Sequence, residues 1–105
     1  MVSNKQKWMI LIEKAKVHEL SGNNQMCLQS IEKAVQEAGH EWKVHFERVS
    51  MLIRLNLISQ AEQACLEALE VHPLTGRLWA QLVQLRREYK KEYKEAYKTF
   101  VYALN

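Results

Sequence analysis

The hydrophobic and polar positions of this chain repeat when the sequence is shifted by 34 residues. Small or apolar residues fall on small or apolar ones, and turn formers fall on turn formers. The matched pairs are Trp8 with Trp42, Gly22 with Asn56, Cys27 with Ala61, Ile31 with Cys65, Ala34 with Ala68, Val35 with Leu69 and Gly39 with Pro73. A fixed period of this length is typical of stacked helix-turn-helix units.

A second step along the chain continues the period. Leu11 leads to His45 and then to Trp79, and Ala15 leads to Val49 and then to Val83. Beyond this point the step lengthens to 35 residues, so that Ala61, Cys65 and Ala68 correspond to Ala96, Phe100 and Ala103. The pattern therefore predicts three repeats, approximately 4–39, 40–74 and 75–105, in a single domain over 1–105.

Each repeat is predicted to contain two helices, because breaks divide the apolar pattern. The expected helices are 4–20, 24–38, 41–55, 59–71, 76–89 and 92–104. Ser21-Gly22-Asn23-Asn24 is a strong break, Asn56 a weaker one, and Pro73 with Gly76 separates the second repeat from the third. Ser59 and Thr75 are candidate N-caps.

The third repeat leaves two possibilities open. The segment 86–93 contains no Gly, Pro or Asn where the turn between its helices should fall. Either a turn lies near 89–91, or one continuous helix extends from 76 to 104.

Composition favours an all-α fold. One Pro and three Gly among 105 residues are too few turn formers for a many-stranded sheet. The net charge of +3 comes from interspersed basic and acidic side chains, so it does not demand a nucleic-acid partner. The apolar run 8–12 is too short for a signal peptide or a membrane span, so we expect no membrane association and a cytoplasmic or nuclear protein.

The two cysteines, Cys27 and Cys65, both lie within helical apolar patterns. Neither has a second Cys or a His at the spacing of metal ligands. We therefore expect two buried free thiols and no disulfide.

Every second helix carries the spacing Ala-x3-large-x2-Ala. The three instances are Cys27-Ile31-Ala34, Ala61-Cys65-Ala68 and Ala96-Phe100-Ala103. With the 34-residue period, Trp79-x2-Leu82 and Pro73, this spacing resembles the tetratricopeptide repeat (TPR) family over nearly the whole chain. The related half-TPR (HAT) repeats of RNA-processing scaffolds are similar as well. The resemblance implies an α-α superhelix, a solenoid of about three helix-turn-helix repeats.

The resemblance also implies a function. In such arrays the first helix of each repeat lines a groove that holds an extended or helical peptide, so the chain is expected to be a protein-protein interaction module or scaffold. The expected groove residues are Met9, Ile12, Lys16, Lys43, Phe46, Ser50, Arg77, Ala80, Gln84 and Arg87. Some relatives grip a terminal carboxylate there, but Lys16, Arg77 and Gln81 supply only part of that set.

The alternative is a piece of an RNA-processing scaffold. The stretch 86–98 is basic, and Tyr89, Tyr93 and Tyr97 are interleaved with its cations. Positive charge beside aromatic faces suits single-stranded RNA. However, Glu88, Glu92 and Glu95 stand at helical spacing from those cations, which favours a solvated face.

The sequence offers no chemistry of its own. Its four histidines form no His-x3-His pair, and neither a nucleophile motif nor a Gly-rich phosphate loop occurs in it. We therefore expect no enzyme activity, no cofactor and no metal.

The last repeat is predicted to leave its end open. Asn105 follows directly on Leu104, whereas the earlier repeats extend about five residues past the matching positions. The residues of this open end are Tyr97, Phe100, Val101 and Leu104. Exposed apolar strips usually mark contact sites, so we expect a longer array, self-association, or docking on another subunit.

Overall fold

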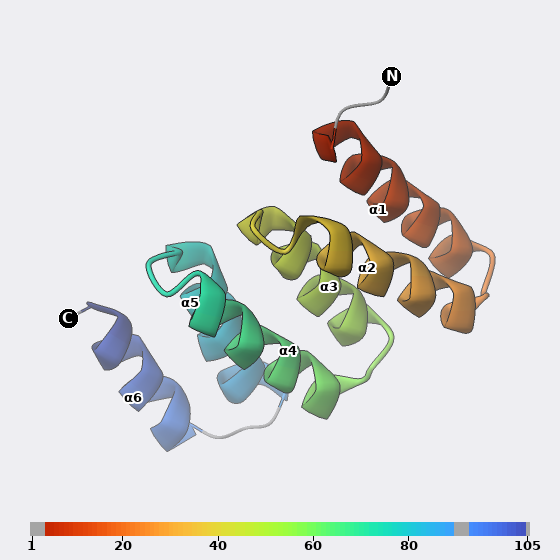
Figure 1. The fold of residues 1–105 in the computed structure, drawn as a ribbon. Coiled ribbons are helices and arrows are strands. Elements are labelled where there is room, and N and C mark those ends of the chain that lie inside the picture. The colour runs from red at the N-terminus through yellow and green to blue at the C-terminus, as the bar shows by residue number, and fades with distance from the viewer. Residues whose placement is uncertain (1–3, 90–92, 105) are drawn as a thin grey trace. The chain divides into compact units, whose positions relative to one another are not determined.

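A computed structural model describes residues 4–89 and 93–104, with side chains for 7–88 and 98–104. The described residues form helices and turns without a β-strand (Figure 1). The helices are α1 (Asn4–Leu20), α2 (Asn24–Ala38), α3 (Trp42–Arg54), α4 (Ile58–Val71), α5 (Gly76–Gln84) and α6 (Tyr93–Leu104), with a π-helical turn, η1 (Leu85–Tyr89), continuing α5. The all-α prediction is confirmed.

The predicted helix bounds agree with the structure to within one residue for the first four helices. Of the two alternatives for the third repeat, one continuous helix from 76 to 104 is wrong, because α6 packs side by side with α5 and η1 (Figure 1). The turn expected near 89–91 falls mostly outside the described residues. None of the described helices is both long enough and apolar enough to cross a membrane.

The chain divides into two compact units, Met1–Arg48 and Val49–Asn105. In the first unit α1 packs against α2. In the second unit α5 packs against α4 on one side and against α6 on another. The grouping of all three repeats into one domain stays a prediction.

Small side chains are buried where the repeat pattern predicts them. Cys27 and Ala34 of α2 are fully buried, and so are Ala61, Cys65 and Ala68 of α4. Such residues let helices approach closely, since larger side chains would hold the backbones apart. Cys27 and Cys65 are both buried and are not joined in a disulfide, as predicted.

The first two repeats turn in the same way. Gly22 and Asn56 both have positive φ, 80° and 61°, at matching positions of the 34-residue period. The amide of Asn23 donates to the carbonyl of His18, and that of Leu57 to Leu52. The left-handed residue and this hydrogen bond define a Schellman cap, which ends a helix while satisfying its last carbonyls.

The N-caps agree only in part with the predicted ones. Asn23 caps α2 through its side-chain oxygen, which accepts from the amide of Met26 at 3.2 Å. Leu57, not Ser59, precedes α4, so the Ser59 cap is wrong. Thr75 does stand at the N-cap of α5, but its side chain makes no capping hydrogen bond.

We expect Ala34→Leu and Ala68→Leu each to lower the free energy of unfolding by about 1–3 kcal/mol, because a larger side chain overpacks a closed helix contact. Urea denaturation measures the change. Gln36→Leu and Gln63→Leu, at exposed positions of the same helices, are the matched controls. Equal stability of all four variants would contradict the repeat register.

We expect Asn56→Gly to be tolerated and Asn56→Val to cost about 1–2 kcal/mol, since a β-branched residue adopts positive φ only with strain. Thermal unfolding followed by circular dichroism tests the pair. Two variants with the same midpoint would show that the positive φ is not a constraint.

Candidate functional site

The predicted groove residues of the first unit do not share one environment. Ile12 is only 4% exposed and packs in the core, so its placement on a contact surface is corrected. Lys16 forms ion pairs with Glu13 at 3.5 Å and Glu47 at 4.0 Å. Met9 and Lys43 are exposed.

Phe46 is half-buried against an aromatic neighbour. Its ring stands edge-on to Trp42, with centroids 6.1 Å apart and planes at 79°. Such T-shaped pairs stabilise by about 0.5–1.5 kcal/mol beyond burial, so this ring is partly engaged within the unit.

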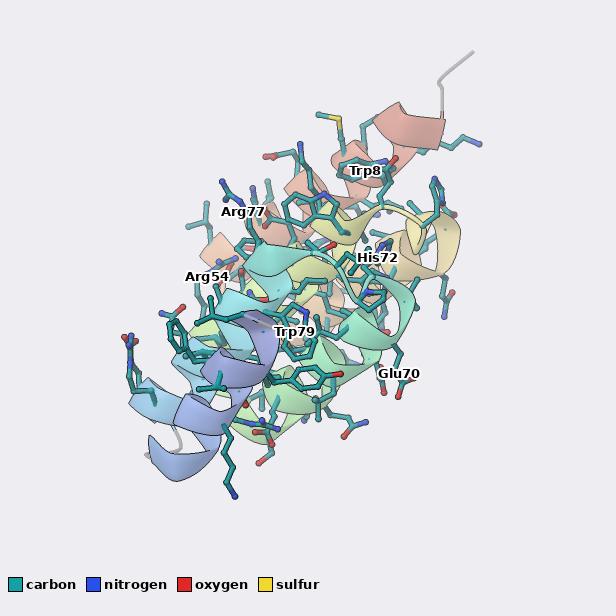
Figure 2. The ribbon with its side chains drawn as sticks, turned by 90° about the vertical axis from the view of Figure 1, so that its left-hand side faces the viewer. Trp8, Arg54, Glu70, His72, Arg77 and Trp79 are labelled. Atoms are coloured by element: carbon teal, nitrogen blue, oxygen red, sulfur yellow. The ribbon has the colours of Figure 1, made fainter. Side chains whose placement is uncertain are left out.

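The predicted groove residues of the second unit divide in two. Ser50 is half-buried and accepts a hydrogen bond from the Gln81 amide at 3.1 Å, which holds α3 to α5. This bond, with the burial of Gln81, removes Gln81 from any carboxylate-gripping set. Arg77, Ala80, Gln84 and Arg87 are exposed, with Arg77 marked in Figure 2.

A groove of about 560 Å³ lies between α5 and α6. Its volume falls within the usual range for ligand sites. It is lined by Pro73, Leu74, Gly76, Trp79, Ala80, Val83, Gln84, Arg87, Phe100, Ala103 and Leu104. Residues expected on the groove (Ala80, Gln84, Arg87) and residues expected at the open end (Phe100, Leu104) therefore meet on one surface, which we call the α5/α6 groove.

The other two residues of the predicted open end have separate outcomes. Val101 is exposed on α6 but does not line the groove. The side chain of Tyr97 lies outside the described residues. Phe100 and Leu104 are 50% and 71% exposed, so an apolar strip is present on α6.

Trp79 fixes the wall of the groove between α5 and α6 (Figure 2). Its indole N–H donates to the carbonyl of Pro73 at 2.7 Å, and its ring contacts Tyr102 with centroids 5.2 Å apart. The indole thus ties the loop before α5 to the last turn of α6. The sequence did not place Trp79 or Val83 on a contact surface. Their counterparts in the second repeat, His45 and Val49, are buried, so the repeat pattern carries no signal of a surface role.

One end of the groove is polar. The Gln84 amide donates to one oxygen of Glu88 at 3.2 Å, and the Arg87 guanidinium donates to the other at 3.1 Å. The hydrogen bond from Arg87, followed by that from Gln84, lowers the pKa of the Glu88 carboxyl. These two donors therefore form a site that already accommodates a carboxylate.

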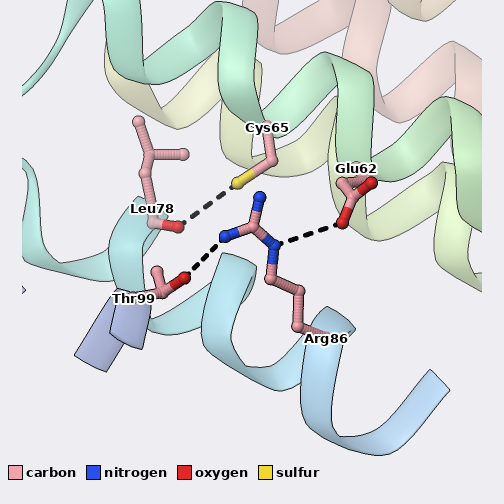
Figure 3. A network of polar contacts seen from close by, with 5 residues as sticks. All are labelled: Glu62, Cys65, Leu78, Arg86 and Thr99. Carbon is pink, nitrogen blue, oxygen red and sulfur yellow. Dashed lines mark hydrogen bonds and ion pairs between the residues drawn. The ribbon is translucent and has the colours of Figure 1, made fainter. Parts of the chain in front are cut away.

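Behind the groove, polar contacts connect α4, α5, η1 and α6 (Figure 3). Arg86 binds Glu62 at 3.2 Å and donates to the Thr99 hydroxyl at 2.6 Å. The Cys65 thiol donates to the carbonyl of Leu78 at 3.3 Å. The sequence predicted that Arg86 faces solvent with the other basic residues of 86–98. In the structure Arg86 is half-buried and holds α6 in place. This is a correction to the solvated-face prediction at this residue.

Burial raises the pKa of the Cys65 thiol to about 12, although the nearby Arg86 guanidinium partly opposes the shift. A thiol in such surroundings stays protonated and unreactive. Within the described residues, no cluster of three or more His, Cys, Asp or Glu side chains could hold a metal ion. The features of this region are those of a contact surface.

Comparison with known proteins connects this architecture to a family. The family model for "PRP6, TPR-like domain" matches residues 1–105. A TPR-containing protein of Dictyostelium discoideum is 41% identical over 51 residues, which cover 49% of this chain and 4% of that protein. The match thus spans a small fraction of this relative's length.

Solved structures share the fold. The TPR domain of Arabidopsis OM64 superimposes with a TM-score of 0.73 and 22% identity, covering 97% of this chain and 84% of that one. The first TPR of Spaghetti (RPAP3), bound to the HSP90 peptide SRMEEVD, superimposes with a TM-score of 0.69 and 20% identity. The match covers 93% of this chain and 81% of that one. The second TPR of Spaghetti, bound to the same peptide, has a TM-score of 0.70 and 16% identity, and the match covers 96% of this chain and 87% of that one. The predicted TPR-like α-α superhelix class is confirmed.

We expect the stability of the chain to fall as pH rises from about 9 towards about 12, in part through Cys65. The pKa of the Cys65 thiol is higher in the folded chain than in the unfolded one. Its contribution to stability is therefore fully present below the unfolded pKa and is lost as the pH rises towards the folded pKa. Urea denaturation from pH 8 to 11 should show a shallower loss of stability for Cys65→Ala, because this variant lacks the thiol. Parallel curves would contradict the assignment.

Proposed function

This chain belongs to the family described as PRP6, TPR-like domain, and we propose that it is a protein-interaction module that binds a short segment of another protein in the α5/α6 groove. The observation that carries the proposal is the groove itself, whose walls are mostly apolar and whose one polar end presents two donors. A folded partner segment can bury apolar side chains there while an acidic group meets the donors.

The walls specify the class of segment. Trp79, Val83, Phe100 and Leu104 offer apolar surface from two helices, which suits an amphipathic helix or an extended peptide with spaced apolar anchors. Arg87 can form charge-assisted bonds to a carboxylate of that segment. The Spaghetti TPR domains, similar in fold, hold the HSP90 peptide SRMEEVD, which supports a peptide-binding role for a surface of this architecture.

The proposed role is binding without catalysis, in the cytoplasm or nucleus. A second candidate is a scaffold of an RNA-processing complex that contacts RNA through 86–98. Arg86 of that stretch is half-buried and engaged with Glu62 and the Thr99 hydroxyl, so the basic stretch offers one cation fewer to RNA, which favours the protein partner. The salt dependence of binding to single-stranded oligouridine separates the two candidates.

A selection of displayed peptides against the chain tests the proposal. We expect Ala80→Glu to weaken the selected peptides by about tenfold or more, because it places a carboxylate on the apolar wall. Fluorescence anisotropy with a labelled peptide measures the affinity. Gln63→Glu, which adds the same group at an exposed position of α4 outside the groove, should leave it unchanged. Equal affinities of the two variants would place binding elsewhere.

A further inference from the structure

Helix α1 carries apolar side chains on two faces. Trp8, Ile12 and Ala15 point into the core and are buried. On another face Ile10 and Val17 are 57% and 62% exposed. A helix that is apolar on more than one face is normally covered on each of them. The second face of α1 therefore has the composition of a contact that the described chain does not make.

The repeat register identifies that face. One step of 34 residues takes Ile10 to Val44 and Val17 to Met51 in α3. A second step takes them to Leu78 in α5 and Leu85 at the start of η1. These four counterparts are fully buried. The exposed face of α1 is thus the same face that α3 and α5 bury.

The second unit shows what this face contacts. The Cys65 thiol of α4 reaches the backbone carbonyl of Leu78, and Ser50 of α3 accepts from the Gln81 amide. Helix α5 therefore docks on both helices of the repeat before it. The contact positions on those two helices are Ser50 and Cys65.

The counterparts of these two positions line the α5/α6 groove. Ser50 corresponds to Gln84 by the 34-residue step, and Cys65 to Phe100 by the 35-residue step. Cys65 is 0% exposed whereas Phe100 is 50% exposed, and Leu69 of α4 is 6% exposed whereas its counterpart Leu104 is 71% exposed. The groove is a docking site for a first helix, seen without that helix.

We propose that α1 of a second copy of this chain docks in the α5/α6 groove, head to tail, in the way α5 docks on α3 and α4. The inference rests on the proposed function, since it names an occupant of the same groove. In this register Ile10 of the second copy meets Phe100, and its Glu13, the counterpart of Gln81, meets Gln84.

The hydrogen-bond donors at the polar end of the groove suit this occupant. Glu13 brings a carboxylate to the place where Gln84 and Arg87 already donate to that of Glu88. The guanidinium has five N–H donors, enough to serve both carboxylates. The present partner of Glu13 is Lys16 at 3.5 Å, an exposed pair of the kind that stabilises little, so it is readily exchanged.

One contact of the earlier repeats is not reproduced. Arg48 of α3 pairs with Glu32 of α2 at 2.6 Å, and the corresponding positions in the proposed contact are Lys14 and Val101. The aliphatic stem of Lys14 can lie across Val101 with its ammonium in water. The ion pair is replaced by an apolar contact.

The geometry determines the kind of assembly. A head-to-tail contact uses two different surfaces, so every added copy offers a free groove at one end and a free α1 at the other. In this contact one helix packs against two helices of the other copy, so the interface is small. Interfaces of this size bind weakly. Association should therefore grow with concentration without stopping at a dimer.

Two blocked variants test this by sedimentation velocity. The head-blocked variant carries Ile10→Glu and Val17→Glu, and the tail-blocked variant carries Phe100→Glu and Leu104→Glu. We expect the unmodified chain to gain mass with concentration, each blocked variant to stay monomeric, and an equimolar mixture of the two to form a 1:1 dimer and nothing larger. Val71→Glu, at an exposed apolar position on neither face, should associate like the unmodified chain.

Three results would overturn the proposal: a monomeric unmodified chain at every concentration, a mixture that stays monomeric, or a head-blocked variant that still self-associates, which would indicate a symmetric contact.

Circular dichroism checks that each variant is folded. Should a double variant lose its helical signal, Val17→Gln and Leu104→Gln give the same comparison. The head-blocked variant keeps its groove, so it should still bind the selected peptide. Peptide binding without association would overturn the head-to-tail contact alone and leave the proposed function standing.

Discussion

Close approach between helices depends on side chains no larger than a thiol. Ala34 in α2 and Ala61, Cys65 and Ala68 in α4 are fully buried, and each stands where a helix axis must come near its neighbour. Larger residues such as Ile31 then fill the spaces between contacts. Because the small residues recur at a fixed period, each repeat carries the same kind of packing surface.

The same constraint produces the proposed binding surface. A repeat of this kind buries its apolar residues only when another helix lies on it, as α5 does on α4. On α6 the corresponding residues, Phe100 and Leu104, remain exposed and form a wall of the groove. A surface of the kind that packs between repeats is thereby left exposed, and packing and the proposed binding rely on the same chemistry: apolar burial with a few polar groups that fix the register.

Polar contacts keep that surface in shape. The half-buried guanidinium of Arg86 joins a carboxylate on α4 to a hydroxyl on α6, while Trp79 joins the Pro73 loop to Tyr102. A partly buried ion pair of this kind stabilises by holding a geometry more than by its Coulomb energy, since desolvation offsets much of the attraction. Here the geometry held is the position of α6, and therefore the width of the groove.

The sequence by itself determined the helices, their turns and the repeat, because helical periodicity and turn chemistry at Gly22, Asn56 and Pro73 are local properties. It also identified Phe100, Val101 and Leu104 as an exposed strip. Only the tertiary structure decided that Ile12 is core, that Arg86 is engaged, and that the strip joins Ala80, Gln84 and Arg87 in one groove. Those outcomes depend on which helix lies against which face, and the same residue type is buried or exposed according to that neighbour.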